Sequence, residues 1–303
     1  MVSRQPRVCR YVAALPPFAF TEELALRLDL VIPAHNEANR IASTIVRYLA
    51  ALGPEDRILV ALDGCTDSTA DVVVSTASGD PRVEVLCYPK LGKGGVLIET
   101  FRRCRADVVG FVDADGATPP SELHSLVQLV TDGGFDGAIA GRRHGTAVLP
   151  KRRPRMRRLT SAGFAIGIRA LFGLPFADTQ CGAKVLRRSL IEECVPLLSA
   201  RDFLFDVDLL HVAMRRGARI AEVPTVWIDD RDSRLVLGRD TRRMALSAVS
   251  LWLHHHVLPV PTAASEPDAA AVIALDEHRP ALARAAAGVG GPAGTESGVG
   301  ADA

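Results

Sequence analysis

The sequence predicts an α/β domain with a doubly wound, mostly parallel sheet flanked by helices. Apolar runs rich in Val, Ile and Leu recur along the first 140 residues, at 28–32, 58–62, 83–86, 108–112 and 138–140. Near-continuous apolarity without alternation is typical of strands that are buried on both faces. Helical patterns separate these runs, and strands separated by helices imply parallel pairing through right-handed crossovers.

The composition is that of an ordinary globular protein. The 303 residues suffice for one large domain, and 36 Lys and Arg against 35 Asp and Glu leave a net charge of +1, which gives no argument for a nucleic-acid partner. The six cysteines show no paired spacing and no signal peptide precedes them, so we expect reduced thiols in a cytoplasmic protein. No apolar stretch reaches the roughly 18 residues that span a bilayer.

Changes in composition suggest three regions. Residues 1–27 form an N-terminal extension without periodicity, residues 28–258 form the domain, and residues 259–303 form an Ala/Gly/Pro-rich tail that we expect to be disordered. Within the domain, a basic segment at 151–158 precedes helical patterns at 161–172 and 205–216, and a last strand is expected at 219–223. Three consecutive histidines, residues 254–256, are predicted to form a surface cluster because consecutive residues diverge around a helix.

Polar clusters follow three of the predicted strands, at 33–37, 63–67 and 113–116. Ligands of doubly wound sheets bind where the carboxyl ends of the strands converge. Asp113 and Asp115 supply the carboxylate oxygens that a hard divalent cation prefers, and such a cation neutralises a departing diphosphate. An Asx turn or a helix cap is the alternative interpretation of this segment.

Two further segments are predicted to face the same crevice. Asp63, directly after its strand, is placed to accept a hydrogen bond from a ligand such as a nucleobase, with Asp67 as the cap of the next helix. The glycine-rich segment 90–95 opens a helix, where backbone N–H groups and two lysines would meet a diphosphate or a base.

Eight motifs, in order over residues 28–228, resemble those of inverting family 2 glycosyltransferases of GT-A fold. The similarity is greatest to the dolichyl- and polyprenyl-phosphate β-glucosyltransferases and mannosyltransferases. The motifs are VIPAHNEANRI, LDGCTDST, KLGKGG, VDADGATPPSEL, AGRR, DTQCGAKVLRR, FDVDLL and EVPTVW.

This resemblance implies a Rossmann-like GT-A domain that binds Mg²⁺ or Mn²⁺ and a nucleotide-sugar donor. The implied reaction moves a hexose, glucose from UDP-glucose, with inversion to a polyprenyl phosphate at the cytoplasmic membrane face. By position, the implied donor-binding residues are Pro33, Ala34, Glu37, Asp63, Lys93, Asp113, Ala114 and Asp115, of which Asp113 and Asp115 are also the metal ligands.

The chain departs from the family pattern at two positions. Leu62 stands where family members usually have a first aspartate, so fewer contacts to the base are expected. Ala117 stands where the mannosyltransferases often have glutamine, which favours the glucosyl pattern. The membrane-spanning segment of eukaryotic glucosyl members is also missing from the sequence, which favours a soluble acceptor over a lipid one; with a lipid acceptor, the protein would be peripheral to the inner face of the plasma membrane.

The resemblance implies three catalytic candidates on the acceptor side of the site, Asp206, Asp178 and Gln180. Asp206 shares a helix face with apolar anchors and matches the family's general base, so it would deprotonate an alcohol; a helix cap is the alternative. A polyprenyl phosphate is already ionised, and the cations Arg142, Arg153 and Arg158 would then bind it or an anionic membrane surface.

The same motifs are compatible with other functions. A soluble hydroxyl acceptor, such as a specialised metabolite, is the main alternative, and a non-catalytic nucleotide-sugar binding module is a remote one. A nucleotidyltransferase would need a glycine- and arginine-rich first loop, which residues 33–37 lack. The sequence gives no prediction of the oligomeric state.

Overall fold

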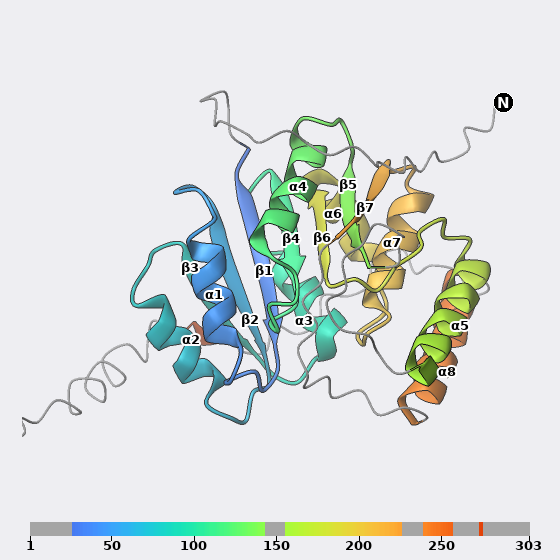
Figure 1. Ribbon diagram of the computed structural model, residues 1–303, viewed down its shortest axis with the longest axis horizontal. Coiled ribbons are helices and arrows are strands. Elements are labelled where there is room, and N and C mark those ends of the chain that lie inside the picture. The colour runs from blue at the N-terminus through green and yellow to red at the C-terminus, as the bar shows by residue number, and fades with distance from the viewer. Residues whose placement is uncertain (1–25, 143–154, 226–238, 257–272, 275–303) are drawn as a thin grey trace, which may run out of the picture.

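One sheet of eight strands runs through the part of the chain that the computed structural model describes, residues 26–142, 155–225, 239–256 and 273–274. The strand order is β7-β5-β6-β4-β1-β2-β3-β8 (Figure 1). The strands are β1 (Leu28–Ala34), β2 (Arg57–Asp63), β3 (Val83–Tyr88), β4 (Val108–Val112), β5 (Gly137–Gly141), β6 (Ala183–Arg187), β7 (Ile220–Pro224) and β8 (Ile273–Ala274).

The pairing confirms the predicted doubly wound, mostly parallel sheet. Strand β1 pairs in parallel with both β2 and β4, β2 pairs in parallel with β3, and β5 pairs in parallel with β7. The winding therefore reverses between β1 and β4, which places a ligand crevice at the carboxyl ends of these two strands.

Strand β6 was missed by the sequence analysis. It lies between β4 and β5 and is antiparallel to both. Its five residues, AKVLR, follow a polar segment and carry a lysine in second place, so they lack the continuous apolar run that identified the other buried strands.

Helices cover both faces of the sheet. Helices α1, α2 and α4 share one apolar cluster with one set of strand side chains, whereas α3, α6, α7, α5 and α8 contribute to the cluster on the other face. The helices are α1 (Ile41–Leu49), α2 (Thr69–Ala77), α3 (Gly92–Phe101), α4 (Pro120–Thr131), α5 (Arg155–Phe172), α6 (Arg188–Cys194), the 3₁₀ turn η1 (Val195–Leu197), α7 (Phe205–Arg215) and α8 (Arg239–His256).

Helices α5 and α8 pack side by side at the margin of the molecule (Figure 1). None of the helices in the described ranges is long and apolar enough to cross a bilayer.

One expectation about the end of an element needs correction. Pro33 and Ala34, expected in the loop after the first strand, continue β1 and pair with Ala61 and Leu62. In the segment expected to be disordered, Ile273 and Ala274 form β8, antiparallel to β3, because this short apolar stretch can add to the open sheet edge. The other residues of that segment lie outside the described ranges.

Candidate functional site

The loop after β4 carries Asp113 and Asp115 at the predicted crevice. Helix α1 fixes this loop through three donors that reach its backbone carbonyls. The Thr44 hydroxyl donates to Ala114 O at 2.9 Å, Arg47 Nη2 donates to Gly116 O at 3.0 Å, and the Tyr48 hydroxyl donates to Thr118 O at 3.0 Å. Gly116 turns the loop with a φ of 65°, a conformation that favours glycine.

The two aspartates repel one another. Burial and the neighbouring Asp113 carboxylate raise the pKa of Asp115 above its ordinary value, although the Ala117 N–H donates to Asp115 Oδ1 at 3.0 Å. Asp113 in turn lies so close to Gly182 that a Cβ at this glycine would fall 1.9 Å from Asp113 Oδ2. A cation bound between the carboxylates would relieve their repulsion.

The donor set suits Mg²⁺ or Mn²⁺. Hard cations of this size are commonly held by one or two carboxylates together with water and substrate phosphate oxygens. Within the described ranges, no group of three His, Cys, Asp or Glu side chains has the geometry of a complete metal cage. Asp113 and Asp115 therefore fit a metal whose remaining ligands come from a bound diphosphate.

A line of alternating charges leads from Asp113 into the core. Lys93 Nζ lies 2.9 Å from Asp113 Oδ1 and 3.2 Å from Asp206 Oδ2, and Lys184 Nζ lies 2.6 Å from Asp206 Oδ1. Burial by itself would raise the pKa of Asp206, but the two ammonium groups outweigh burial and hold this pKa below the usual aspartate value. Burial likewise opposes the charge of Lys93, and its two carboxylate partners raise its pKa above the usual lysine value.

Lys184 is the main site residue that the sequence analysis missed. Its side chain is fully buried in β6, and its ammonium also donates to Cys181 O at 2.7 Å. A lysine inside a short apolar segment was the available signal, because a buried ammonium requires an anionic partner.

The glycine-rich segment was expected to present backbone N–H groups to a diphosphate, and this expectation is wrong for four of them. The N–H groups of Leu91 and Gly92 donate to Asp63 Oδ1 at 2.6 and 3.1 Å. The N–H groups of Gly94 and Gly95 donate to Arg201 O at 3.0 and 3.2 Å. The glycines are required for this close approach to the chain, since a Cβ at Gly94 would lie 2.3 Å from Ala200 O.

Asp63 ties two loops of the crevice together. Its other carboxylate oxygen pairs with Lys90 Nζ at 2.8 Å, and the carboxylate is only 4% exposed. His35 Nδ1 lies 2.7 Å from the Asp63 carbonyl, which links the loop after β1 to the end of β2. A direct contact between Asp63 and a base stays a prediction.

The remaining donor-side residues lie around the same edge. The Glu37 carboxylate pairs with Arg40, whose Nε donates at 2.8 Å, and the Glu37 N–H donates to Thr69 Oγ1 at 2.8 Å. Ala34 and Ala114 are buried and Pro33 is half-buried. Asp67 Oδ1 accepts the N–H of Thr69, the first residue of α2, at 3.0 Å.

On the acceptor side, Arg142 and Asp178 form a bidentate ion pair. Arg142 Nε lies 2.7 Å from Asp178 Oδ2, and Nη2 lies 3.0 Å from Oδ1. The guanidinium also donates to the carbonyl of Gln180 at 3.1 Å, and Glu222 accepts the Asp178 N–H at 2.8 Å. With a carboxylate that is 2% exposed, Asp178 has the geometry of a residue that orients Arg142.

Two predicted acceptor residues fall outside what the structure describes. Arg153 lies outside the described ranges, and Arg158 lies in the first turns of α5, where only the backbone is described. Burial opposes the charge of Arg142, but Asp178 and, more weakly, Asp113 outweigh burial and raise the pKa of this guanidinium above its usual value. The structure thus brings together Arg142, Lys93 and the acidic pair.

The histidines at the end of α8 do not form the expected surface cluster. His255 is turned inward, with Nε2 2.6 Å from Asp208 Oδ1 and a side chain that is 6% exposed. The ring centroids of His255 and His256 lie 5.1 and 5.5 Å from that of buried His211. The prediction was wrong for His255, because helix α8 packs its last turn against α7; His256 also approaches His211 but is exposed.

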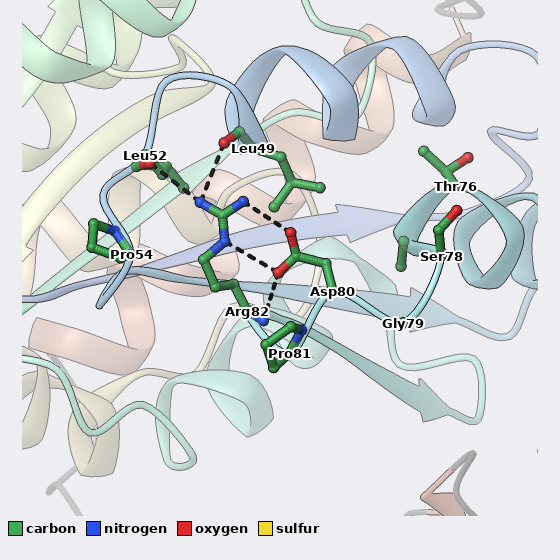
Figure 2. Close-up of a pocket in the computed structure, with 10 residues that line it drawn as sticks. Leu49, Leu52, Pro54, Thr76, Ser78, Gly79, Asp80, Pro81 and Arg82 are labelled. Atoms are coloured by element: carbon green, nitrogen blue, oxygen red, sulfur yellow. Dashed lines mark hydrogen bonds and ion pairs between the residues drawn. The ribbon is translucent and has the colours of Figure 1, made fainter.

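A second hollow lies away from this chemistry. A cavity of about 900 Å³ near the amino-terminal ends of β2 and β3 is lined by residues 76–82 and by Leu49, Leu52 and Pro54. Figure 2 shows Arg82 reaching across it, with bonds to Asp80 and to the carbonyls of Leu49 and Leu52. These contacts brace the turn before β3, at the opposite edge from Asp113.

Comparisons with known proteins agree with this geometry. Residues 29–195 match the family described as Glycosyl transferase family 2. The chain is 31% identical over 243 residues to glycosyltransferase AglD of Haloferax volcanii, a match that covers 77% of this chain but 38% of that protein. It is 30% identical to the dolichyl-phosphate beta-glucosyltransferase ALG5C of Trichomonas vaginalis, over 74% of this chain and 70% of that one.

Solved structures show the same fold. Glucosyl-3-phosphoglycerate synthase of Mycobacterium tuberculosis in complex with UDP superposes with a TM-score of 0.61 at 21% identity, over 79% of this chain and 86% of that one. The same enzyme with Mn²⁺, UDP-glucose and phosphoglyceric acid gives a TM-score of 0.58 at 21% identity, over 75% and 80% of the two chains.

The family match spans more than half of the 303 residues, and it includes β1 through α6 with the acidic loop after β4. The predicted GT-A fold is confirmed, and the chain is a glycosyltransferase that belongs to glycosyl transferase family 2.

Proposed function

We propose that this protein transfers glucose from UDP-glucose, with inversion, to a polyprenyl phosphate. Relatives with this kind of chemistry support the proposal, since ALG5C is a dolichyl-phosphate beta-glucosyltransferase and the M. tuberculosis enzyme has been crystallised with UDP-glucose. The single observation that carries the choice of acceptor is the environment of Asp206.

Asp206 is a poor general base in this site. Its carboxylate is 2% exposed, and both oxygens are paired with lysine ammonium groups that hold its pKa low. Efficient proton abstraction requires a base whose pKa lies near the working pH and whose oxygen reaches the acceptor hydroxyl. An alcohol acceptor would need such a base, whereas a polyprenyl phosphate brings its own ionised oxygen to the anomeric carbon.

Asp113 and Asp115 would hold the divalent cation, which supplies charge stabilisation to the departing diphosphate. Lys93 is placed beside Asp113 to add a second positive charge at the same point, with Asp206 and Lys184 fixing its position from behind. Arg142, held by Asp178 in a fixed plane, is oriented to bind the acceptor phosphate.

Helices α5 and α8 offer a surface for peripheral contact with the inner face of the plasma membrane. Leu246, Val249 and Leu253 on α8 are 70%, 50% and 42% exposed, and Ile166 on α5 is 65% exposed. The three α8 residues follow one another at spacings of three and four, which places them on one helix face. In the sequence, arginines at 155, 157 and 158 and at 239, 242 and 243 fall at the start of the two helices, and helices that combine basic and apolar residues suit an anionic lipid surface.

The central test is a transfer assay with purified protein, radiolabelled UDP-glucose, Mn²⁺ and polyprenyl phosphate in detergent micelles. We expect label in the organic-extractable lipid product, in β-linkage, and less label with GDP-mannose. Parallel reactions contain phosphoglycerate or a cell extract as acceptor. Transfer only to a soluble product would replace the lipid acceptor by a hydroxyl acceptor, and donor binding without transfer to any acceptor would leave a binding module.

Membrane contact is tested by sedimentation with vesicles. We expect the protein to sediment with phosphatidylglycerol vesicles more than with phosphatidylcholine vesicles, and the Leu246→Glu/Val249→Glu variant to remain in the supernatant. Val46→Glu is the matched control, because Val46 is 55% exposed on α1, far from α8 in the fold. Equal loss of sedimentation in the control variant would remove α8 as the contact surface.

A further inference from the structure

The last turn of α8 is connected to α7 by a short polar contact. His255 Nε2 lies 2.6 Å from Asp208 Oδ1, with the two side chains 6% and 0% exposed. A carboxylate oxygen only accepts, so the Nε2 of His255 carries the proton of this hydrogen bond. Neither group takes part in the chemistry proposed above.

The other oxygen of Asp208 holds the chain that precedes α7. Asp208 Oδ2 accepts the N–H groups of Ser199 and Ala200 at 2.7 and 2.8 Å. A buried carboxylate that accepts two backbone N–H groups and one histidine N–H fixes all three partners in a single geometry. The position of the segment Ser199–Ala200 therefore depends on the orientation of Asp208.

The same segment holds the start of α3. Arg201 O accepts the N–H groups of Gly94 and Gly95 at 3.0 and 3.2 Å, and these glycines directly follow Lys93. Lys93 is the cation that contacts both Asp113 and Asp206. A displacement of residues 199–201 would therefore move the backbone from which the Lys93 side chain extends.

The segment 199–202 is not closely packed against α8, so packing contacts cannot take the place of these hydrogen bonds. A cavity of about 540 Å³ separates the segment from α8, lined on one side by residues 199–202 and on the other by Ser247, Ser250, Leu251 and His254. Because the segment faces this cavity, its hydrogen bonds to Asp208 contribute more to holding it in place than they would in a closely packed core.

We propose that His255 is a positioning residue for the donor site, acting through Asp208, the segment 199–201 and the glycines of α3 on Lys93. Through these contacts, helix α8, whose outer face is exposed, sets the geometry of the donor site. The catalytic part of the inference, an effect on UDP-glucose kinetics, rests on the sugar transfer proposed above. The mechanical part, that His255 holds residues 199–201 and the glycines of α3 in place, does not.

The mechanical part is tested by hydrogen exchange in the absence of substrate. His255→Phe keeps a ring and removes the donor, His255→Gln keeps an N–H donor, and His256→Gln is the control, since His256 is exposed and its Nδ1 contacts the Trp252 carbonyl within α8. We expect the Gly94 and Gly95 amides to exchange at least about tenfold faster in His255→Phe, the scale of one lost charge-assisted hydrogen bond. His255→Gln should fall between wild type and His255→Phe.

The kinetic part is tested with UDP-glucose and the acceptor varied separately. We expect His255→Phe to raise the KM for UDP-glucose about tenfold, with the acceptor KM unchanged and with partial recovery in His255→Gln. A merely structural role would lower the active fraction, which reduces kcat and leaves both KM values unchanged.

Unaltered exchange at Gly94 and Gly95 in His255→Phe would overturn the inference, whatever the protein transfers. If His255→Phe does not fold, Asp208→Asn is measured instead, because it keeps the size of the side chain and weakens the same contacts. Faster exchange without any sugar transfer would leave the mechanical link in place and count against the proposed function alone.

Discussion

Lys184 and Asp206 form an ion pair inside the core, with Nζ 2.6 Å from Oδ1 and side chains that are 0% and 2% exposed. Phe111 packs beside this pair, with the Lys184 ammonium 5.4 Å from its ring centroid. Removing one partner of such a pair leaves a buried charge with fewer bonds, which costs more than an exposed pair contributes.

Lys184→Met should lower the free energy of unfolding by about 3 kcal/mol, because Asp206 would then retain only Lys93 as a cationic partner. Urea denaturation followed by circular dichroism measures this loss. Lys90→Met is the control, since Lys90 is 55% exposed in its pair with Asp63, and it should cost less than about 1 kcal/mol. Equal costs for the two variants would contradict the importance of the buried pair.

Asp115→Asn should have opposite effects on the free and the metal-loaded protein. Without metal, the melting temperature should rise slightly, because the substitution removes a buried charge that Asp113 repels. With Mn²⁺ and UDP-glucose, the stabilising shift seen in the wild type should be lost, with affinity reduced about tenfold or more. Differential scanning fluorimetry measures both.

Asp107→Asn serves as the control for this experiment, because Asp107 is 44% exposed and lies before β4, at the opposite edge of the sheet. A full metal-dependent shift in Asp115→Asn would show that the acidic loop does not bind the cation.

Gly94→Ala should destabilise the protein by about 2 kcal/mol or more and weaken UDP-glucose binding. The new Cβ would lie 2.3 Å from Ala200 O and 2.8 Å from Phe205 Cβ, so the backbone must shift. Gly163→Ala on α5 is the matched substitution, with nothing within 4 Å of its Cβ, and it should be neutral or stabilise by up to about 1 kcal/mol. Thermal melts and calorimetric titration compare the two.

Acidification should destabilise the protein through His211. Burial, followed by the neighbouring His255, lowers the pKa of His211 from 6.5 to about 4. Between these pH values the unfolded chain binds a proton that the folded protein excludes, so this contribution to stability is complete above pH 6.5 and is lost as the pH falls toward 4.

The expected loss through His211 is about 3 kcal/mol over that interval. His211→Phe removes the titrating group, and its melting temperature should fall less than that of the wild type across the same pH range. Parallel pH profiles for the two proteins would show that His211 has no part in the acid sensitivity.

Much of the fold follows from local sequence. The parallel strands and α7 lie within two residues of their predicted bounds, because a buried apolar run or an amphipathic face identifies each of them. Strand β6 was not predicted because Lys184 interrupts its apolar run. Only the three-dimensional structure shows that this lysine is buried and paired with Asp206. The contact between Lys184 on β6 and Asp206 on α7 is a tertiary contact, which periodicity does not encode.

For the candidate site, too, the sequence predicted some features and not others. The acidic pair and Lys93 were identified because polar residues at strand ends gather at one edge of a parallel sheet. The inward roles of Asp63, Asp178 and the glycines were not, because a carboxylate that binds ligand and one that holds a loop have the same sequence context. The bonds to Leu91, Arg142 and Arg201 distinguish them.

The antiparallel insertion of β6 also determines when the active centre can be assembled during synthesis. Strands β1 to β4 leave the ribosome early and can pair among themselves, but β5 and β7 reach this half of the sheet only through β6. Because β6 carries Lys184, the nascent chain closes its sheet and neutralises Asp206 only after both segments have emerged. A chain that stalls before α7 would therefore expose the edge of β4 or a lysine without its counter-ion, either of which would attract chaperones or drive aggregation.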